Sequence, residues 1–330
     1  MNKYTLGPGP VPPSGAAEMA EPASLEAADL VSDTDLSAAG ARAVLNVAAQ
    51  MRRDPAAFRG SLAGKTLALL FEKPSLRTRV TFEVAMKSLG GDSLFLDCRS
   101  EPLGSREPVC DVARNLDRWV SAIAARTFRH STVEELAKWA EIPVINALSD
   151  RVHPCQALAD MLTLENAFGG LQGLKLAYVG DGNNVAHSLL LTGTKLGVHV
   201  SVATPSNHAP DPAIVAIARE CALQAGASVS ILTDPTEAAA GAHAIYTDVW
   251  TSMGSEHEAE SRRKHFQPYQ VNEALFAGAD PKAIFMHCLP AHRGEEVTHE
   301  VMESPRSVVF DQAENRLHAQ KALLWLLLGK

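Results

Sequence analysis

Residues 65–97, KTLALLFEKPSLRTRVTFEVAMKSLGGDSLFLD, contain one complete strand–helix–strand pattern. The apolar run KTLALLF predicts a buried strand, SLRTRVTFEVAMKSLG predicts a helix that ends at a glycine pair, and DSLFLD predicts a second strand. Leu76, Val80 and Val84 recur at i, i+4 and i+8, which is the spacing of one helix face. Strands that are joined through a helix pair in parallel, so this segment predicts an α/β fold.

The same alternation continues along the chain and predicts two doubly wound α/β domains with mainly parallel central sheets, linked by helices. Ser131 and Glu134 form a capping-box pattern at the start of one predicted helix. Further strands are predicted at 121–127, 143–148, 175–181, 199–205, 228–234, 243–250 and 283–290, and further helices at 107–120, 131–141, 153–168, 187–197, 212–227, 235–242 and 315–329.

Composition limits the class of protein. A chain of 330 residues is long enough for two domains, and a net charge of −8 without a basic stripe argues against a protein that coats nucleic acid. No apolar run has the length of a membrane span, and the first 24 residues have neither an apolar signal core nor an arginine-rich transit pattern. They are rich in Pro, Gly and Ala and predict a flexible tail.

The five cysteines are widely spaced, odd in number and without a CxxC pair. This pattern argues against a disulfide framework and favours a reducing, cytoplasmic location.

Polar motifs follow the predicted strands at the edge where ligands bind to parallel sheets. Ser75 stands where an N-cap residue would, and Arg77, Thr78 and Arg79 follow it. A helix N-terminus with arginines predicts a phosphate site, although an ordinary capped helix with surface arginines would have the same sequence.

Two further candidates are Arg126, at the end of a predicted strand, and HPCQ at 153–156. His153 precedes a proline, so its backbone is extended, and Gln156 begins the following helix. These two side chains could hold a carbonyl oxygen and an amide group.

VGDGNN, residues 179–184, resembles the start of a dinucleotide fingerprint. The third glycine position falls on Val185, and the next strand ends without an acid for a ribose hydroxyl. A turn that brings Asn183 or Asn184 to the crevice is the better interpretation, and a nicotinamide-dependent dehydrogenase is the alternative.

DVWTSMG (248–254) and HCLPAHRGEEV (287–297) leave two other strands. His287, Cys288 and His292 could be read as zinc ligands, but adjacent strand residues point to opposite faces and no second pair completes a site. A buried structural thiol is commoner than a nucleophile at a position such as Cys288.

Together, SLRTR, HPCQ, DVWTSMG and HCLP, in this order, resemble the aspartate/ornithine carbamoyltransferase family, and most of all its ornithine branch. The resemblance runs from about residue 25 to the end. It implies transfer of the carbamoyl group of carbamoyl phosphate to the δ-amine of L-ornithine, giving L-citrulline and phosphate in arginine biosynthesis or a urea-cycle-type step. It also implies a homotrimer or a multiple of trimers, without metal or organic cofactor.

The resemblance also divides the chain by function. Residues 25–152, with the C-terminal helix 312–330, would bind carbamoyl phosphate, and residues 153–311 would bind ornithine. Two alternatives stay open: an enzyme acting on an N-acylated ornithine or another amine, since Leu76 stands where many ornithine enzymes have Thr, and a non-catalytic protein that binds carbamoyl phosphate.

Carried over position by position, the resemblance implies specific roles. Carbamoyl phosphate would contact Ser75, Leu76, Arg77, Thr78, Arg126, His153, Gln156, Cys288, Leu289 and Arg316. Arg77, Arg126, His153, Gln156, Cys288 and Arg316 would be the catalytic residues. Ornithine would contact Asn184, Asp248, Ser252 and Met253.

Overall fold

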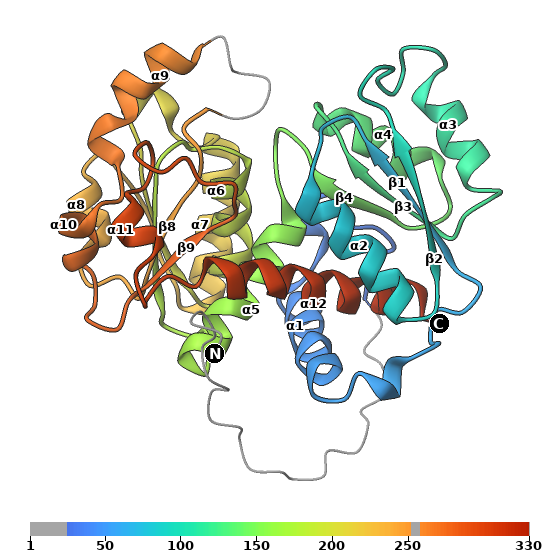
Figure 1. The fold of residues 1–330 in the computed structure, drawn as a ribbon, viewed down its shortest axis with the longest axis horizontal. Coiled ribbons are helices and arrows are strands. Elements are labelled where there is room, and N and C mark those ends of the chain that lie inside the picture. The colour runs from blue at the N-terminus through green and yellow to red at the C-terminus, as the bar shows by residue number, and fades with distance from the viewer. Residues whose placement is uncertain (1–24, 252–257, 330) are drawn as a thin grey trace. The chain divides into compact units, whose positions relative to one another are not determined.

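The structure is a computed structural model that describes residues 25–251 and 258–329 (Figure 1). The chain divides into two compact units. The N-terminal unit holds the described residues up to Leu162 together with those from Asn315 on, and the C-terminal unit runs from Thr163 to Glu314. Two helices, α5 (Pro154–Phe168) and α12 (Val309–Leu328), pass from one unit into the other.

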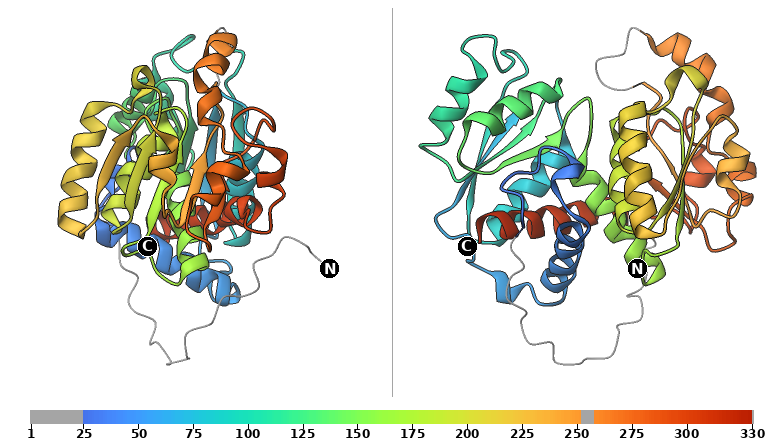
Figure 2. Two further views of the ribbon diagram at one scale, coloured as in Figure 1. Left: turned by 90° about the vertical axis from the view of Figure 1, so that its left-hand side faces the viewer. Right: turned by 180° about the vertical axis from the view of Figure 1, so that it is seen from behind.

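The N-terminal unit has a parallel sheet in the order β2-β1-β3-β4. From β1 the chain moves to the edge strand β2, and it then returns across the sheet to β3 and β4. Because crossover connections between parallel strands are right-handed, this change of direction places α2 on one face of the sheet and α3 and α4 on the other, as the two opposite views show (Figures 1 and 2). The elements are β1 (Thr66–Phe71), β2 (Asp92–Asp97), β3 (Ala122–Arg126), β4 (Val144–Leu148), α1 (Ala38–Arg53), α2 (Leu76–Ser88), α3 (Val109–Leu116), α4 (His130–Trp139) and the short η1 (Asp33–Asp35) and η2 (Ala56–Phe58).

The C-terminal unit has a parallel sheet in the order β7-β6-β5-β8-β9. The strand order turns back at β5, so the carboxyl ends of β5, β8 and β9 lie at the point where ligands bind to such sheets. The elements are β5 (Lys175–Val179), β6 (His199–Ala203), β7 (Val229–Leu232), β8 (Ala244–Thr247), β9 (Ile284–His287), α6 (Asn184–Ser188), η3 (Leu189–Gly193), η4 (Ser206–His208), α7 (Pro212–Ala225), α8 (Pro235–Ala239), α9 (Ala259–Phe266), η6 (Gln267–Tyr269), α10 (Glu273–Ala277) and α11 (His299–Met302).

Each sheet is covered by apolar side chains that the strand and helix periods place on facing surfaces. Ala68, Ile123 and Val144 pack against Val133 and Leu136 of α4 in the N-terminal unit. In the C-terminal unit a core of aromatic and small side chains lies against β5, β8 and β9; it includes Ala177, Ile245, Phe285, Phe266, Phe276 and Trp250. The prediction of parallel sheets flanked by helices is confirmed.

The start of α4 differs from its prediction. The N-cap position is Arg129, with no side-chain cap bond, so Ser131 lies inside the helix and the predicted capping box is wrong. The His130 N–H instead donates to Asp150 Oδ1 at 2.8 Å. The carboxylate of Asp150, twenty positions away in the sequence, thus accepts a hydrogen bond at the start of the helix in place of the predicted Ser131 hydroxyl.

The apolar stripe of α2 is also placed differently from an ordinary core-facing stripe. Leu76, Val80 and Val84 are 74%, 45% and 43% exposed, whereas Phe82 and Met86 of the same helix are buried. The stripe therefore predicted the helix correctly but marks an outward face of it.

Candidate functional site

Ser75 begins α2 as its N-cap residue. Its backbone is extended, with φ −160° and ψ 112°, and its Oγ accepts a hydrogen bond from the Thr78 N–H at 3.2 Å. The positive end of a thirteen-residue helix thus lies directly after β1. The N–H of Thr78, one of the predicted contacts of carbamoyl phosphate, is engaged in this cap, and the Leu76 side chain is directed to solvent.

Arg316 brings α12 to this helix start. Its Nη2 donates to Thr78 Oγ1 at 3.1 Å and its Nη1 donates to Gln156 Oε1 at 2.6 Å. Gln156 in turn donates through Nε2 to Asp160 Oδ1 at 2.8 Å. The planar fork of one buried guanidinium therefore holds α2, α5 and α12 in a common geometry.

His153 lies among these positive charges. It is 4% exposed, and burial together with Arg316 and Arg126 lowers its pKa well below the usual value. Arg126, the last residue of β3, is itself 6% exposed. Since burial and both arginines disfavour the imidazolium, His153 is neutral at physiological pH and the positive charge belongs to the arginines.

The arginines of SLRTR have different surroundings. Arg77 is half-buried at the helix start. Arg79 pairs with Glu83 one turn further on, at 2.8 Å, and its guanidinium lies 3.7 Å from the Phe95 ring centroid, over β2.

Glu72 is a buried acid that the sequence analysis did not single out. Its Oε1 accepts from the Leu103 N–H at 2.9 Å and its Oε2 from the Phe128 N–H at 2.7 Å. Its own N–H donates to Arg126 O. Glu72 therefore fixes the end of β3, and with it Arg126, against the end of β1.

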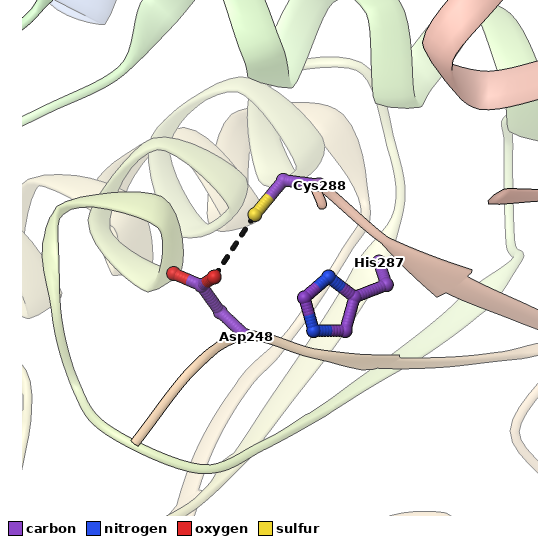
Figure 3. Close-up of side chains that lie close together, drawn as sticks. All are labelled: Asp248, His287 and Cys288. Carbon is purple, nitrogen blue, oxygen red and sulfur yellow. Dashed lines mark hydrogen bonds between the residues drawn. The ribbon is translucent and has the colours of Figure 1, made fainter. Parts of the chain in front are cut away.

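In the C-terminal unit, Asp248 and Cys288 leave the neighbouring strands β8 and β9. Cys288 Sγ donates to Asp248 Oδ1 at 3.0 Å, and Figure 3 shows the sulfur directed at this carboxylate oxygen. Asp248 also accepts from the Val249 N–H at 2.8 Å and from Asn183 Nδ2 at 2.9 Å. Asn183, the N-cap residue of α6, thus orients Asp248, while the predicted Asn184 is the first residue of that helix.

His287 holds the turn that follows Cys288. Its Nδ1 accepts from the Leu289 N–H at 2.8 Å, so its proton lies on Nε2, which is 3.2 Å from Glu296 Oε1. Glu296 is fully buried and also accepts from the His292 N–H. Leu289 has φ 59°, a conformation that a non-glycine residue adopts under local constraint. Sequence reasoning missed Glu296, although an acid nine residues after a strand-end histidine is visible in HCLPAHRGEEV.

Two groups of side chains in the described residues have potential metal-ligating atoms within 4.8 Å of one another: Asp248, His287 and Cys288, and His292, Glu295 and Glu296. In the first group both ring nitrogens of His287 are hydrogen-bonded and the thiol is bonded to Asp248. A metal ion there would have to displace these bonds. Ser252 and Met253 lie outside the described residues.

Backbone conformation and close packing explain the two glycines of VGDGNN. Gly180 has φ 145°, and a Cβ on Gly182 would lie 2.4 Å from Pro210 N and 2.5 Å from His208 O. Close packing between two loops thus requires a glycine at position 182.

Comparisons with known proteins cover both units. The family model described as aspartate/ornithine carbamoyltransferase, carbamoyl-P binding domain, matches residues 28–166, and the model for the Asp/Orn binding domain matches residues 172–327. The chain is 58% identical over 268 residues to "Ornithine carbamoyltransferase, anabolic" from Pyrococcus furiosus. The aligned residues cover 81% of this chain and 85% of that protein.

Solved structures agree. Ornithine carbamoyltransferase from Pyrococcus furiosus superposes with a TM-score of 0.89 at 52% identity, covering 92% of this chain and 98% of that one. An acetylornithine transcarbamylase complexed with acetylcitrulline gives a TM-score of 0.83 at 31% identity, covering 92% and 99%.

Proposed function

Since the chain belongs to the aspartate/ornithine carbamoyltransferase family, we propose that it transfers the carbamoyl group of carbamoyl phosphate to the δ-amine of L-ornithine, giving L-citrulline and phosphate. The acceptor follows from the relatives. In structural alignments, identity is 52% to a protein named for ornithine, from Pyrococcus furiosus, and 31% to one named for acetylornithine. The anabolic name of the first relative supports a role in arginine biosynthesis.

Carbamoyl phosphate binds in the N-terminal unit, at the start of α2. The observation that carries this proposal is the convergence of Arg126, Arg316 and the α2 N-cap around a neutral histidine. A dianionic phosphate suits this excess of positive charge, because arginine forks and helix N-termini both bind oxyanions. The residues proposed to bind carbamoyl phosphate in this unit are Ser75, Leu76, Arg77, Thr78, Arg126, His153, Gln156 and Arg316. The family resemblance adds Cys288 and Leu289 as expected contacts.

The carbamoyl oxygen is polarised by donors that keep their charge throughout the reaction. Arg126 and Arg316 supply that charge, and His153, being neutral, offers a hydrogen bond without competing as a cation. Gln156 presents an amide whose orientation is set by its bonds to Arg316 and Asp160. Preorganised donors of this kind stabilise the oxyanion that develops in the transition state.

Ornithine binds in the C-terminal unit through its amino-acid end. Asp248 is a carboxylate held by three donors, and it would pair with the α-amino group. Asn184, Ser252 and Met253 are proposed as further contacts. The thiol of Cys288 is hydrogen-bonded to Asp248, which supports a positioning role beside the reacting amine rather than a covalent one.

The chemical step needs no protein nucleophile. The neutral δ-amine attacks the carbamoyl carbon, a C–N bond forms, and the C–O bond to phosphate breaks. The departing phosphate takes the electron pair of the broken bond and accepts the proton that the amine loses. Alignment and charge stabilisation are the enzyme's contribution.

The functional test measures phosphate release and the carbamoylated product formed from carbamoyl phosphate with L-ornithine, N-acetyl-L-ornithine, putrescine and L-aspartate in parallel. Product with L-ornithine alone is expected. Turnover restricted to N-acetyl-L-ornithine would overturn the assignment of the acceptor, and tight binding of carbamoyl phosphate without turnover would favour the non-catalytic alternative.

We also propose a homotrimer. The outward face of α2, with Leu76, Val80 and Val84 exposed, supports burial against another copy of the chain. Within the residues that the structure describes, none of the helices is long and apolar enough to cross a membrane, and the cytoplasmic location stays a prediction.

A further inference from the structure

Behind Asp248 lies a buried arginine that the proposed mechanism does not use. Arg262 on α9 is 8% exposed. Its Nε donates to the carbonyl oxygen of Trp250 at 2.6 Å, its Nη2 donates to Asp181 Oδ2, and its Nη1 lies 3.5 Å from Glu258 Oε2. One guanidinium therefore joins the chain after β8, the loop after β5 and the start of α9.

The contact with Trp250 fixes the path of the chain beyond Asp248. The strand β8 ends at Thr247, whose Oγ1 donates to Val179 O at 2.6 Å. Three residues later the Trp250 ring lies 6.2 Å from that of Phe266 at an interplanar angle of 23°. Since Arg262 also lies over Phe266, at 5.2 Å, it holds the Trp250 carbonyl while Phe266 holds the ring.

The contact with Asp181 controls the second segment that orients Asp248. Asp181 and Asn183 belong to one tight turn, in which the Asn183 N–H donates to Asp181 O at 2.7 Å. Asn183 then donates its amide to Asp248. Two of the three segments that hold the Asp248 carboxylate, the chain after β8 and the turn with Asn183, are therefore tied to Arg262, and the third donor is Cys288 after β9.

We propose that Arg262 is a positioning residue for the amino-acid acceptor, which sets the Asp248 carboxylate for the α-amino group without touching the substrate. This inference rests on the proposed function, because it concerns the binding of ornithine. It predicts an effect on the binding of ornithine but not on that of carbamoyl phosphate. The network of Arg262, Asp181 and Trp250 lies entirely in the C-terminal unit, and it shares no residue with the phosphate cluster of the N-terminal unit, which consists of Arg126, His153, Arg316 and the N-terminus of α2.

The charges of the network determine which variants are informative. Burial raises the pKa of Asp181 to about 6, and the positive charge of Arg262 acts against this rise. His208 faces the same pair, with its Nδ1 3.7 Å from Asp181 Oδ1 and 3.4 Å from Arg262 Nη1. Removing Arg262 alone leaves a buried acid without its cation, so a double variant with Asp181→Asn separates positioning from charge burial.

The experiment measures steady-state citrulline formation by the full chain with each substrate varied in turn. Arg262→Met keeps the apolar contact with Phe266 and removes the donors. We expect the KM for L-ornithine to rise about tenfold or more, as for the loss of a charged hydrogen bond, and the KM for carbamoyl phosphate to stay within about twofold. Arg262→Lys, which keeps the charge but not the fork, should give an intermediate KM for ornithine.

Arg263→Met is the matched control, because Arg263 lies on the same helix but is 57% exposed and pairs with Glu295. It should leave both KM values unchanged. An unchanged KM for ornithine in Arg262→Met, or equal rises for both substrates, would overturn the proposal. If Arg262→Met does not fold, Asp181→Asn/Arg262→Met and Arg262→Lys provide the same comparison. A wild-type chain that makes no citrulline would refute the proposed function itself, independently of any variant.

Discussion

Arg316→Met tests the phosphate cluster most directly. Arg316 is 2% exposed and donates two hydrogen bonds, to Gln156 Oε1 at 2.6 Å and to Thr78 Oγ1 at 3.1 Å. Bonds from a charged donor are worth about 1.5–3 kcal/mol each, and one oxyanion donor about 3 kcal/mol in the transition state. Since the freed partners recover part of this by other bonds, we expect a net loss of about 2.7 kcal/mol, or on the order of a hundredfold in kcat/KM for carbamoyl phosphate.

The assay follows initial rates of citrulline formation with carbamoyl phosphate varied at saturating L-ornithine. Arg316→Lys keeps the charge without the fork and should lose on the order of tenfold. Arg114→Met changes an arginine on α3 that is 54% exposed, and it serves as the control. A kcat/KM for Arg316→Met within about threefold of wild type, in protein that melts normally, would show that this arginine does not bind the substrate.

Three further predictions concern other parts of the molecule. Burial lowers the pKa of His153 in the folded state, so below the ordinary histidine pKa of about 6.5 the unfolded chain binds more protons and stability falls as pH decreases. Between pH 7 and pH 5 the melting temperature of His153→Gln should therefore fall by less than that of the wild type. An equal fall in both proteins would contradict this. Cys288→Ser keeps a donor to Asp248 and should retain activity within about tenfold, whereas a loss of several orders of magnitude would indicate a covalent nucleophile. Val84→Glu places a charge on the exposed face of α2 and should shift the chain toward monomers in light scattering; an unchanged mass at dilute concentration would remove this face from the interface.

The order of strands and helices was predictable from sequence because their signals are local. The periods of KTLALLF and DSLFLD are read within one segment, and the predicted parallel sheets follow from the helices between them. The helix α1 was missed, although Ser37 caps it and Val44, Leu45 and Ala48 form its buried face, a signal that was present in the sequence. The Ser131 cap failed because α4, whose His130 N–H bonds to Asp150, begins two residues earlier than a cap at Ser131 would place it.

The candidate site residues were proposed from four motifs and a family resemblance, and their roles stay predictions. Sequence alone established which residue types stand at the strand ends: arginines after β1 and at the end of β3, and an acid and a thiol after β8 and β9.

Tertiary structure decided how these groups are charged and held, because their partners are distant in the chain. Arg316 reaches Thr78 across 238 positions, Arg262 reaches Asp181 across 81, and Asp248 meets Cys288 across 40. The protonation of His153 and the support that Glu72 gives to Arg126 likewise depend on burial and on neighbours from other strands and helices. A periodic pattern encodes the secondary structure of its own segment, whereas the environment of a buried charge exists only once the sheets have assembled.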